Sequence, residues 1–146
     1  MLDGWSLVRF VHVLAAMVWV GGQLTLTVML LPVIRARLGP AERGAVMREV
    51  GRRFGIFTLT VFLPLQVATG VLLAWHRGVT LAALTDPGYG RTLLAKLVVV
   101  TLVMAISGVH GWAQRRGRPA LARSFAVGSL LGSLIIVLLA TALPAT

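Results

Sequence analysis

The sequence of 146 residues contains no cysteine and only four acidic residues. Without cysteine, disulfides, thiolate metal sites and thiol chemistry are excluded. Fourteen lysines and arginines give a formal net charge of +10, which by itself would suit a protein that binds nucleic acid. The basic residues, however, cluster between long apolar runs, which is the pattern of a membrane protein, and we therefore expect no nucleic-acid partner.

Long apolar runs dominate the chain, and 58% of its residues are hydrophobic. Four runs, at about residues 5–34, 54–75, 92–113 and 124–143, are each long enough to cross a hydrocarbon core of about 30 Å. Their Leu, Ala and Val content, without two-residue alternation, predicts helices and not barrel strands. The sequence therefore predicts an all-α integral membrane protein, a four-helix transmembrane bundle in which residues 1–146 form a single domain within the lipid bilayer.

The positions of the basic residues predict the orientation in the membrane. Ten of the fourteen lie in the loops that follow the first and third runs. By the positive-inside rule these loops face the cytoplasm, whereas both termini and the middle loop face outward. No basic segment precedes the first run, so we expect a retained helix and not a signal peptide. Residues 40–53 are expected to form a short amphipathic helix on the cytoplasmic surface.

Three of the predicted helices carry a stripe of polar residues. With 100° between successive residues, the stripes comprise His12, Ala16, Trp19 and Gln23 on the first helix, Gln66, Thr69 and His76 on the second, and Lys96, Val100, Val103, Ser107 and His110 on the third. Because a polar group in lipid needs a partner, we expect the stripes to face one another. On the fourth helix, Gly128 and Gly132 with Ser129 and Ser133 predict close helix approach, which also suits a homo-oligomer formed through this helix.

The ionisable residues of the outer half form the candidate site. With a rise of 1.5 Å per residue, His12 lies about 10 Å and Lys96 about 8 Å below the outer membrane edge, whereas His110 lies near the cytoplasmic end. The predicted cofactor-binding residues are His12, Lys96, His76, Arg9 and Trp19, with His12 and His76 as metal ligands. Two imidazoles with two cations suit a haem b, whose propionates would pair with Arg9 and Lys96. Imidazoles also suit a copper ion, and both cofactors stay open.

Two segments are similar to a known family. The run from His12 to Gly22, His-Val-Leu-Ala-Ala-Met-Val-Trp-Val-Gly-Gly, resembles the first helix of the CopD-like (copper resistance protein D) membrane proteins. The run from Tyr89 to Lys96 resembles the Tyr-Gly-Arg-x-Leu-Leu-x-Lys segment that opens a later helix in that family. The resemblance covers most of the chain from Val8 to about Arg116. It implies copper handling, in resistance or uptake, at the bacterial inner (cytoplasmic) membrane.

Two alternative functions remain. The same superfamily includes HemJ, a four-helix haem-b protein that oxidises protoporphyrinogen, and the chain resembles HemJ at His12, Trp19 and Lys96. That resemblance implies a haem-b oxidoreductase with an electron-transfer partner. The other alternative is a structural subunit without a cofactor, packed against another membrane protein. Because the sequence offers no carboxylate pair, nucleophile–base arrangement or phosphate loop, it leaves open whether the protein is an enzyme.

Overall fold

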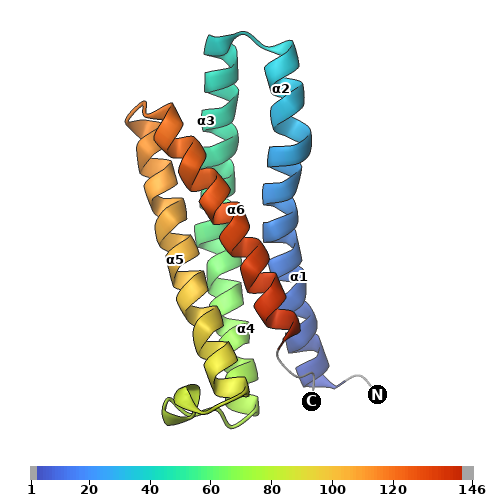
Figure 1. Ribbon diagram of the computed structural model, residues 1–146. Helices are drawn as coiled ribbons and strands as arrows, with labels where there is room; N and C mark the ends of the chain where they lie inside the picture. The colour runs from blue at the N-terminus through green and yellow to red at the C-terminus, as the bar shows by residue number, and fades with distance from the viewer. Residues whose placement is uncertain (1–2, 143–146) are drawn as a thin grey trace. The chain divides into compact units, whose positions relative to one another are not determined.

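The computed structural model describes residues 3–142, and most of them are helical (Figure 1). These residues contain no strand, and four continuous helical stretches are long and apolar enough to cross a membrane. The prediction of an all-α protein with four transmembrane helices is confirmed, and the chain is that of a multi-pass membrane protein. It divides into two compact units, residues 1–76 and 77–146. The expectation of a single domain stays a prediction.

The first span of unit 1 runs from Gly4 to Arg37 without a break. It consists of α1 (Gly4–Leu24), the π-helical segment η1 (Thr25–Leu30) and α2 (Leu31–Arg37). The carboxylate of Asp3 caps α1 by accepting hydrogen bonds from the backbone N–H and the hydroxyl of Ser6. The hydroxyl of Ser6 is the main reason why the pKa of Asp3 lies below its ordinary value.

The second span runs from Pro40 to His76 and comprises α3 (Pro40–Phe57), the π-helical segment η2 (Thr58–Phe62) and α4 (Leu63–His76). Residues 40–53 are helical as expected, but they continue directly into the second span and are not a separate surface helix. One reason is that Glu49 forms ion pairs of 2.8 Å with Arg52 and 2.6 Å with Arg53, the i, i+3 and i, i+4 pairs that support a helix.

Both π-helical segments begin with the same four residues, Thr-Leu-Thr-Val, at positions 25–28 and 58–61. Each segment also ends directly before a Leu-Pro pair, at residues 31–32 and 63–64. Proline has no N–H and its ring collides with the preceding turn of a regular α-helix, so a wider turn accommodates it. The wider turn in each copy of this short repeat explains why both spans stay continuous through a proline.

Helices α1 and α4 pack against each other in antiparallel directions. Three pairs of residues mark the interface of α1 with α4 and with Phe62, the last residue of η2: Trp5 with His76, His12 with Thr69, and Trp19 with Phe62. Successive pairs are seven residues apart on each helix, which is the spacing of a left-handed helix pair. The stripes predicted on the first two helices therefore face each other.

Unit 2 is a hairpin of α5 (Tyr89–Arg115) and α6 (Pro119–Thr141), preceded by the short 3₁₀ segment η3 (Ala82–Thr85). These helices begin three to five residues before the predicted starts at 92 and 124, and the predicted end at Leu143 lies outside the described residues. Gly88, with φ of 84°, makes the turn ahead of α5.

The small residues of α6 pack on α5. Added to Gly132, a Cβ atom would overlap the side chain of Val103, which is almost fully buried. The hydroxyls of Ser107 and Ser129 lie 2.8 Å apart. Close helix approach is thus confirmed within the chain, and a homo-oligomer through the fourth helix would use its other faces.

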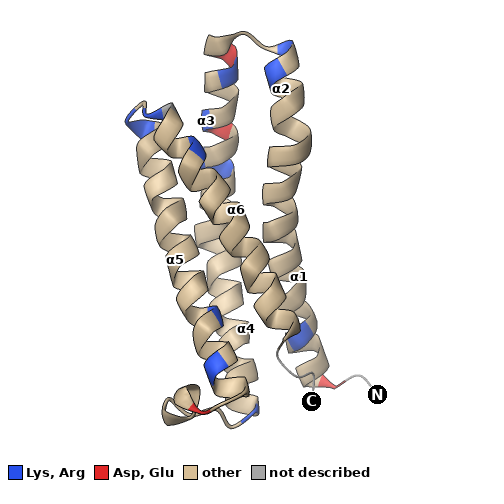
Figure 2. Ribbon diagram, in the orientation of Figure 1, with Lys and Arg blue, Asp and Glu red and all other residues tan. Residues whose placement is uncertain are grey.

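Basic residues gather at one end of each unit (Figure 2). In unit 1 they occupy α2 and α3 near their junction, and Arg9 stands near the other end, on α1. In unit 2, most lie around the turn from α5 to α6. Within each unit the charges are therefore as unequal as the positive-inside rule requires.

Candidate functional site

His12 lies on the face of α1 that packs against α4. Its Nδ1 atom is 2.8 Å from Oγ1 of Thr69, and its Nε2 atom is 3.0 Å from Nε2 of Gln66. Oγ1 of Thr69 also lies 2.6 Å from the carbonyl oxygen of Leu65 in the preceding turn. His12 is thus held by two residues that lie three positions apart on one face of α4.

The placement of these atoms favours one protonation state of the ring. A threonine hydroxyl has one hydrogen, and Thr69 donates it to the carbonyl of Leu65. Thr69 then accepts a hydrogen bond from Nδ1 of His12, so Nδ1 carries the proton. Nε2 faces the amide nitrogen of Gln66, which can only donate, so Nε2 presents its lone pair.

Gly70 makes room for the imidazole. A Cβ atom at this position would lie 3.3 Å from Cε1 of His12, which is tighter than ordinary van der Waals contact. The side chain of Thr69 next to it is buried. Thr69 and Gly70 therefore provide, respectively, the hydrogen-bond partner and the space that the histidine needs.

Gln66 contributes an unusual polar atom. Its Oε1 is buried and has no hydrogen-bond partner within residues 3–142, although its amide nitrogen contacts His12. A buried carbonyl without a partner costs free energy, so it calls for an explanation. Sequence reasoning placed Gln66 and Thr69 on the second polar stripe but did not include them in the site, although their i, i+3 spacing was a usable signal.

The other predicted residues of unit 1 occupy neighbouring layers. The buried ring of Trp19 stacks on Phe62, with centroids 4.6 Å apart and planes 8° apart. The ring of His76 stacks on Trp5 with centroids 3.9 Å apart. Arg9 is exposed on α1. Trp19 and His76 thus share the α1–α4 interface with His12, whereas the side chain of Arg9 does not point into it.

The structure gives His12 and His76 different partners. His76 follows Thr69 by seven residues along α4, a rise of about 10 Å, and the ring of His12 contacts Thr69 and Gln66. A metal ion bound to both histidines would require at least one ring to leave its contacts. In the described part of the chain, no group of three or more His, Asp or Glu side chains is placed to hold a metal ion.

The predicted residues of the third helix belong to unit 2. Lys96 is half-buried on α5, and no described acidic residue of unit 2 lies within ion-pair distance of it. Nδ1 of His110 lies 2.8 Å from the carbonyl oxygen of Ala122 on α6. His110 and Ser107 therefore bond to α6, and the C-terminal part of the third stripe faces the fourth helix.

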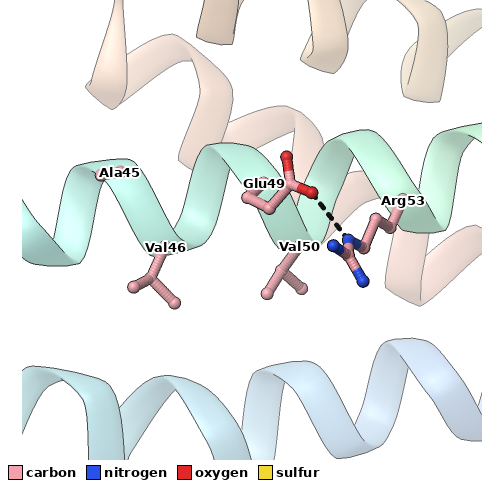
Figure 3. A pocket seen from close by; sticks show the side chains of 5 residues that line it. All are labelled: Ala45, Val46, Glu49, Val50 and Arg53. Carbon is pink, nitrogen blue, oxygen red and sulfur yellow. Dashed lines mark hydrogen bonds and ion pairs between the residues drawn. The ribbon is translucent and has the colours of Figure 1, made fainter.

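The hollow in Figure 3 lies away from these residues. It is an open groove of about 450 Å³ along α3, lined by Ala45, Val46, Val50 and the Glu49–Arg53 ion pair. Val46 and Val50 point toward the helix drawn below them, whereas Glu49 points along α3 toward Arg53. The groove contains none of the predicted ligands, so the candidate site rests on the geometry of His12.

The residues around His12 fit an axial ligand of haem b. A histidine that binds a metal usually donates its other ring N–H to an oxygen acceptor, as His12 does to Thr69. A porphyrin supplies four ligands of its own, so one or two histidines suffice. A copper ion would depend on a larger set of side chains, and copper(I) prefers sulfur to the amide and hydroxyl that contact His12.

Comparison with known proteins gives one relative. Over 112 residues, the chain is 30% identical to an uncharacterized protein of Aquifex aeolicus (strain VF5), and the alignment covers 76% of this chain and 71% of that protein. No protein-family model matches the chain. No solved structure matches it either.

Proposed function

The chain belongs to the same family as this Aquifex aeolicus protein, and we propose for it a CopD-like function at a group bound by His12, which the resemblance at residues 12–22 and 89–96 supports. The protein takes part in copper handling, in resistance or uptake, at the bacterial inner membrane. The observation that supports a ligand role is the hydrogen bond between Nδ1 of His12 and Thr69, which leaves Nε2 as the ligating atom.

Haem b is the group that the donor set favours. His12 would bind its iron through Nε2, and Lys96 and Arg9 would pair with its propionates near the outer membrane edge. When bound, the haem would supply one-electron redox chemistry. The side chains would position it and exclude water from it. The CopD resemblance instead favours a copper ion at His12.

The topology proposed for this function follows from charge. Four crossings with the basic loops in the cytoplasm place both termini outside. His12 then lies in the outer half of the first span, about 10 Å from its end, and Lys96 at a similar depth in the third. A polar or charged side chain at that depth costs free energy. The presence of His12 and Lys96 there therefore supports a role in binding for both.

Optical spectra of the full-length protein purified in detergent, oxidised and reduced, test the proposal together with iron and copper analysis. A Soret band, a sharp α-band on reduction and stoichiometric iron are expected for wild type grown with an adequate haem supply. Stoichiometric copper without a Soret band would show that the bound group is copper and not haem. If the protein contains neither iron nor copper, the proposal fails and the protein is a structural subunit.

A HemJ-like oxidoreductase is the second candidate. The observation that favours it is the stack of Trp19 on Phe62, one layer from His12, because it places an aromatic pair beside the proposed ligand. Oxidation of protoporphyrinogen by the haem-loaded protein, with an added artificial electron acceptor to take up the electrons, tests this candidate, with His12→Ala as the control. If the wild-type protein turns over no faster than the variant, this candidate fails and copper handling remains the proposal.

A further inference from the structure

The two polar neighbours of His12 differ in how well they are satisfied. Thr69 uses its hydroxyl fully, since it accepts from Nδ1 and donates to the carbonyl of Leu65. Gln66 is only half satisfied, since its nitrogen contacts Nε2 while its buried Oε1 has no partner in the described chain. Thr69 thus stabilises the ring, whereas the contact of Gln66 with the ring leaves its own carbonyl unpaired, which costs free energy.

We infer that Thr69 and Gln66 set the ligand state of His12 in opposite ways. Thr69 is a positioning residue that keeps the proton on Nδ1 and so makes Nε2 the ligating atom. The amide of Gln66 contacts Nε2, the atom through which His12 would bind haem b, and would have to leave this contact for the haem to bind. The displacement of Gln66 rests on the proposed function, whereas the role of Thr69 can be tested without any cofactor.

The opposite signs follow from hydrogen-bond chemistry. An acceptor on Nδ1–H raises the basicity of a histidine ligand and fixes the orientation of its ring. A donor on Nε2 does the reverse, because it engages the lone pair that the iron needs. The hydrogen bond from Gln66 is lost when the ligand binds, so this residue opposes binding. If both residues merely supported the fold, removing either one would weaken binding.

The first experiment measures the protonation of His12 by ¹⁵N NMR in the full-length, cofactor-free protein at alkaline pH. The chain has three histidines, and His76→Gln and His110→Gln variants assign their signals. We expect a protonated Nδ1 in wild type, a mixture of both tautomers in Thr69→Val, and the wild-type state in Thr69→Ser. Thr60→Val is the matched control, because among residues 3–142 the Thr60 hydroxyl donates to the carbonyl of Ile56 in its own span and not to a neighbouring helix.

A wild-type spectrum with the proton on Nε2, or an unchanged tautomer in Thr69→Val, would overturn the role of Thr69. Thermal unfolding of each variant identifies any that fails to fold. In that case Thr69→Ala, which removes the hydroxyl without adding a methyl group, answers the same question.

The second experiment titrates ferric haem b into the same proteins. Thr69→Val is expected to weaken binding about 10- to 100-fold and to raise the reduction potential, and Thr69→Ser restores both. Gln66→Leu is expected to tighten binding about fivefold, the equivalent of one net hydrogen bond. Gln114→Leu, the same change in unit 2, leaves binding unchanged.

Weaker binding by a folded Gln66→Leu variant would refute the displacement, since it would make Gln66 a supporting residue. If wild type binds no haem, the proposed function and the displacement of Gln66 both fail. The NMR result then still decides whether Thr69 controls the tautomer of His12.

Discussion

The Nδ1 atom of His12 lies 2.8 Å from Oγ1 of Thr69, although 57 residues separate them in the chain. The contact connects the N-terminal half of α1 to α4 inside the membrane-spanning part of unit 1. In the hydrocarbon core no water replaces a lost polar partner, so such a contact also constrains how the two helices pack. Any group that His12 binds must therefore be compatible with it.

Replacing His12 by alanine is expected to abolish cofactor binding. The same change at His110 is expected to leave binding intact, because His110 bonds to the carbonyl of Ala122 near the opposite end of its span. Absorption spectra of both purified variants, with metal analysis, make the comparison. Equal loss in the two variants would contradict a site in the outer half of the membrane.

Replacing Lys96 by methionine is expected to lower the retention of haem during purification. Methionine keeps the length and apolar character of the stem but removes the charge that pairs with a propionate. The iron content per protein measures the loss, and Lys96→Arg, which keeps the charge, is expected to retain most of the haem. Equal retention by wild type and the methionine variant would reduce Lys96 to a residue that contacts lipid headgroups.

Replacing Gly132 by alanine is expected to destabilise the α5–α6 hairpin by about 1–3 kcal/mol, the usual cost of overpacking. The added methyl group would overlap the side chain of Val103. Reversible unfolding in mixed micelles measures the free energy. Gly108→Ala is the matched control on α5, since a Cβ there meets nothing within 4 Å.

The cause of the Gly132 effect can be tested with a second change. Val103→Ala removes the methyl groups that collide with the new side chain, so the double variant is expected to lose less stability than the sum of the two single variants. Additive losses would show that the α5–α6 contact is looser than the structure indicates.

The start of α1 is expected to loosen at acid pH. Hydrogen bonds from Ser6 hold the pKa of Asp3 below its ordinary value. A depressed carboxyl pKa stabilises the folded state above the ordinary value, and this stabilisation is lost as the pH falls through the lowered value. The protection factor of the Ser6 amide, which is its hydrogen-exchange rate relative to the intrinsic rate at the same pH, should therefore fall in that range.

Asp3→Asn separates the charge of the cap from its geometry. Asparagine keeps an oxygen that can accept from Ser6 but does not titrate. Exchange at Ser6 is expected to lose its dependence on this ionisation in the variant. A wild-type profile in the asparagine variant would assign the effect to another group.

Much of the membrane architecture could be predicted from the sequence. Apolar runs of about 20 residues have few stable forms in lipid, so the number and type of the spans follow from length and composition. The stripe that contains His12 also predicted a polar partner on the second helix, and Thr69 and Gln66 confirm it. The small residues Gly132 and Ser129 similarly predicted the close approach of α6 to α5.

Other features depend on geometry that a linear pattern does not contain. The spans extend beyond their apolar cores, because helices continue through polar residues such as Glu49 and Arg53 when those residues pair with each other. The π-helical turns depend on how Pro32 and Pro64 fit between neighbouring turns. Depth alone placed His12 and His76 in one cluster, whereas ring orientation gives them separate partners.

The constant spacing along the α1–α4 interface limits how the chain can change in length. From one pair to the next, the residue number rises by seven on α1 and falls by seven on the facing helix, from Trp5 with His76 to Trp19 with Phe62. Inserting one residue into α1 between Trp5 and His12 would turn these two faces about 100° relative to each other, so both pairs could not form at once. Relatives that bind the same group are therefore expected to keep the distance between these residues, and to accept insertions in the loop between α2 and α3.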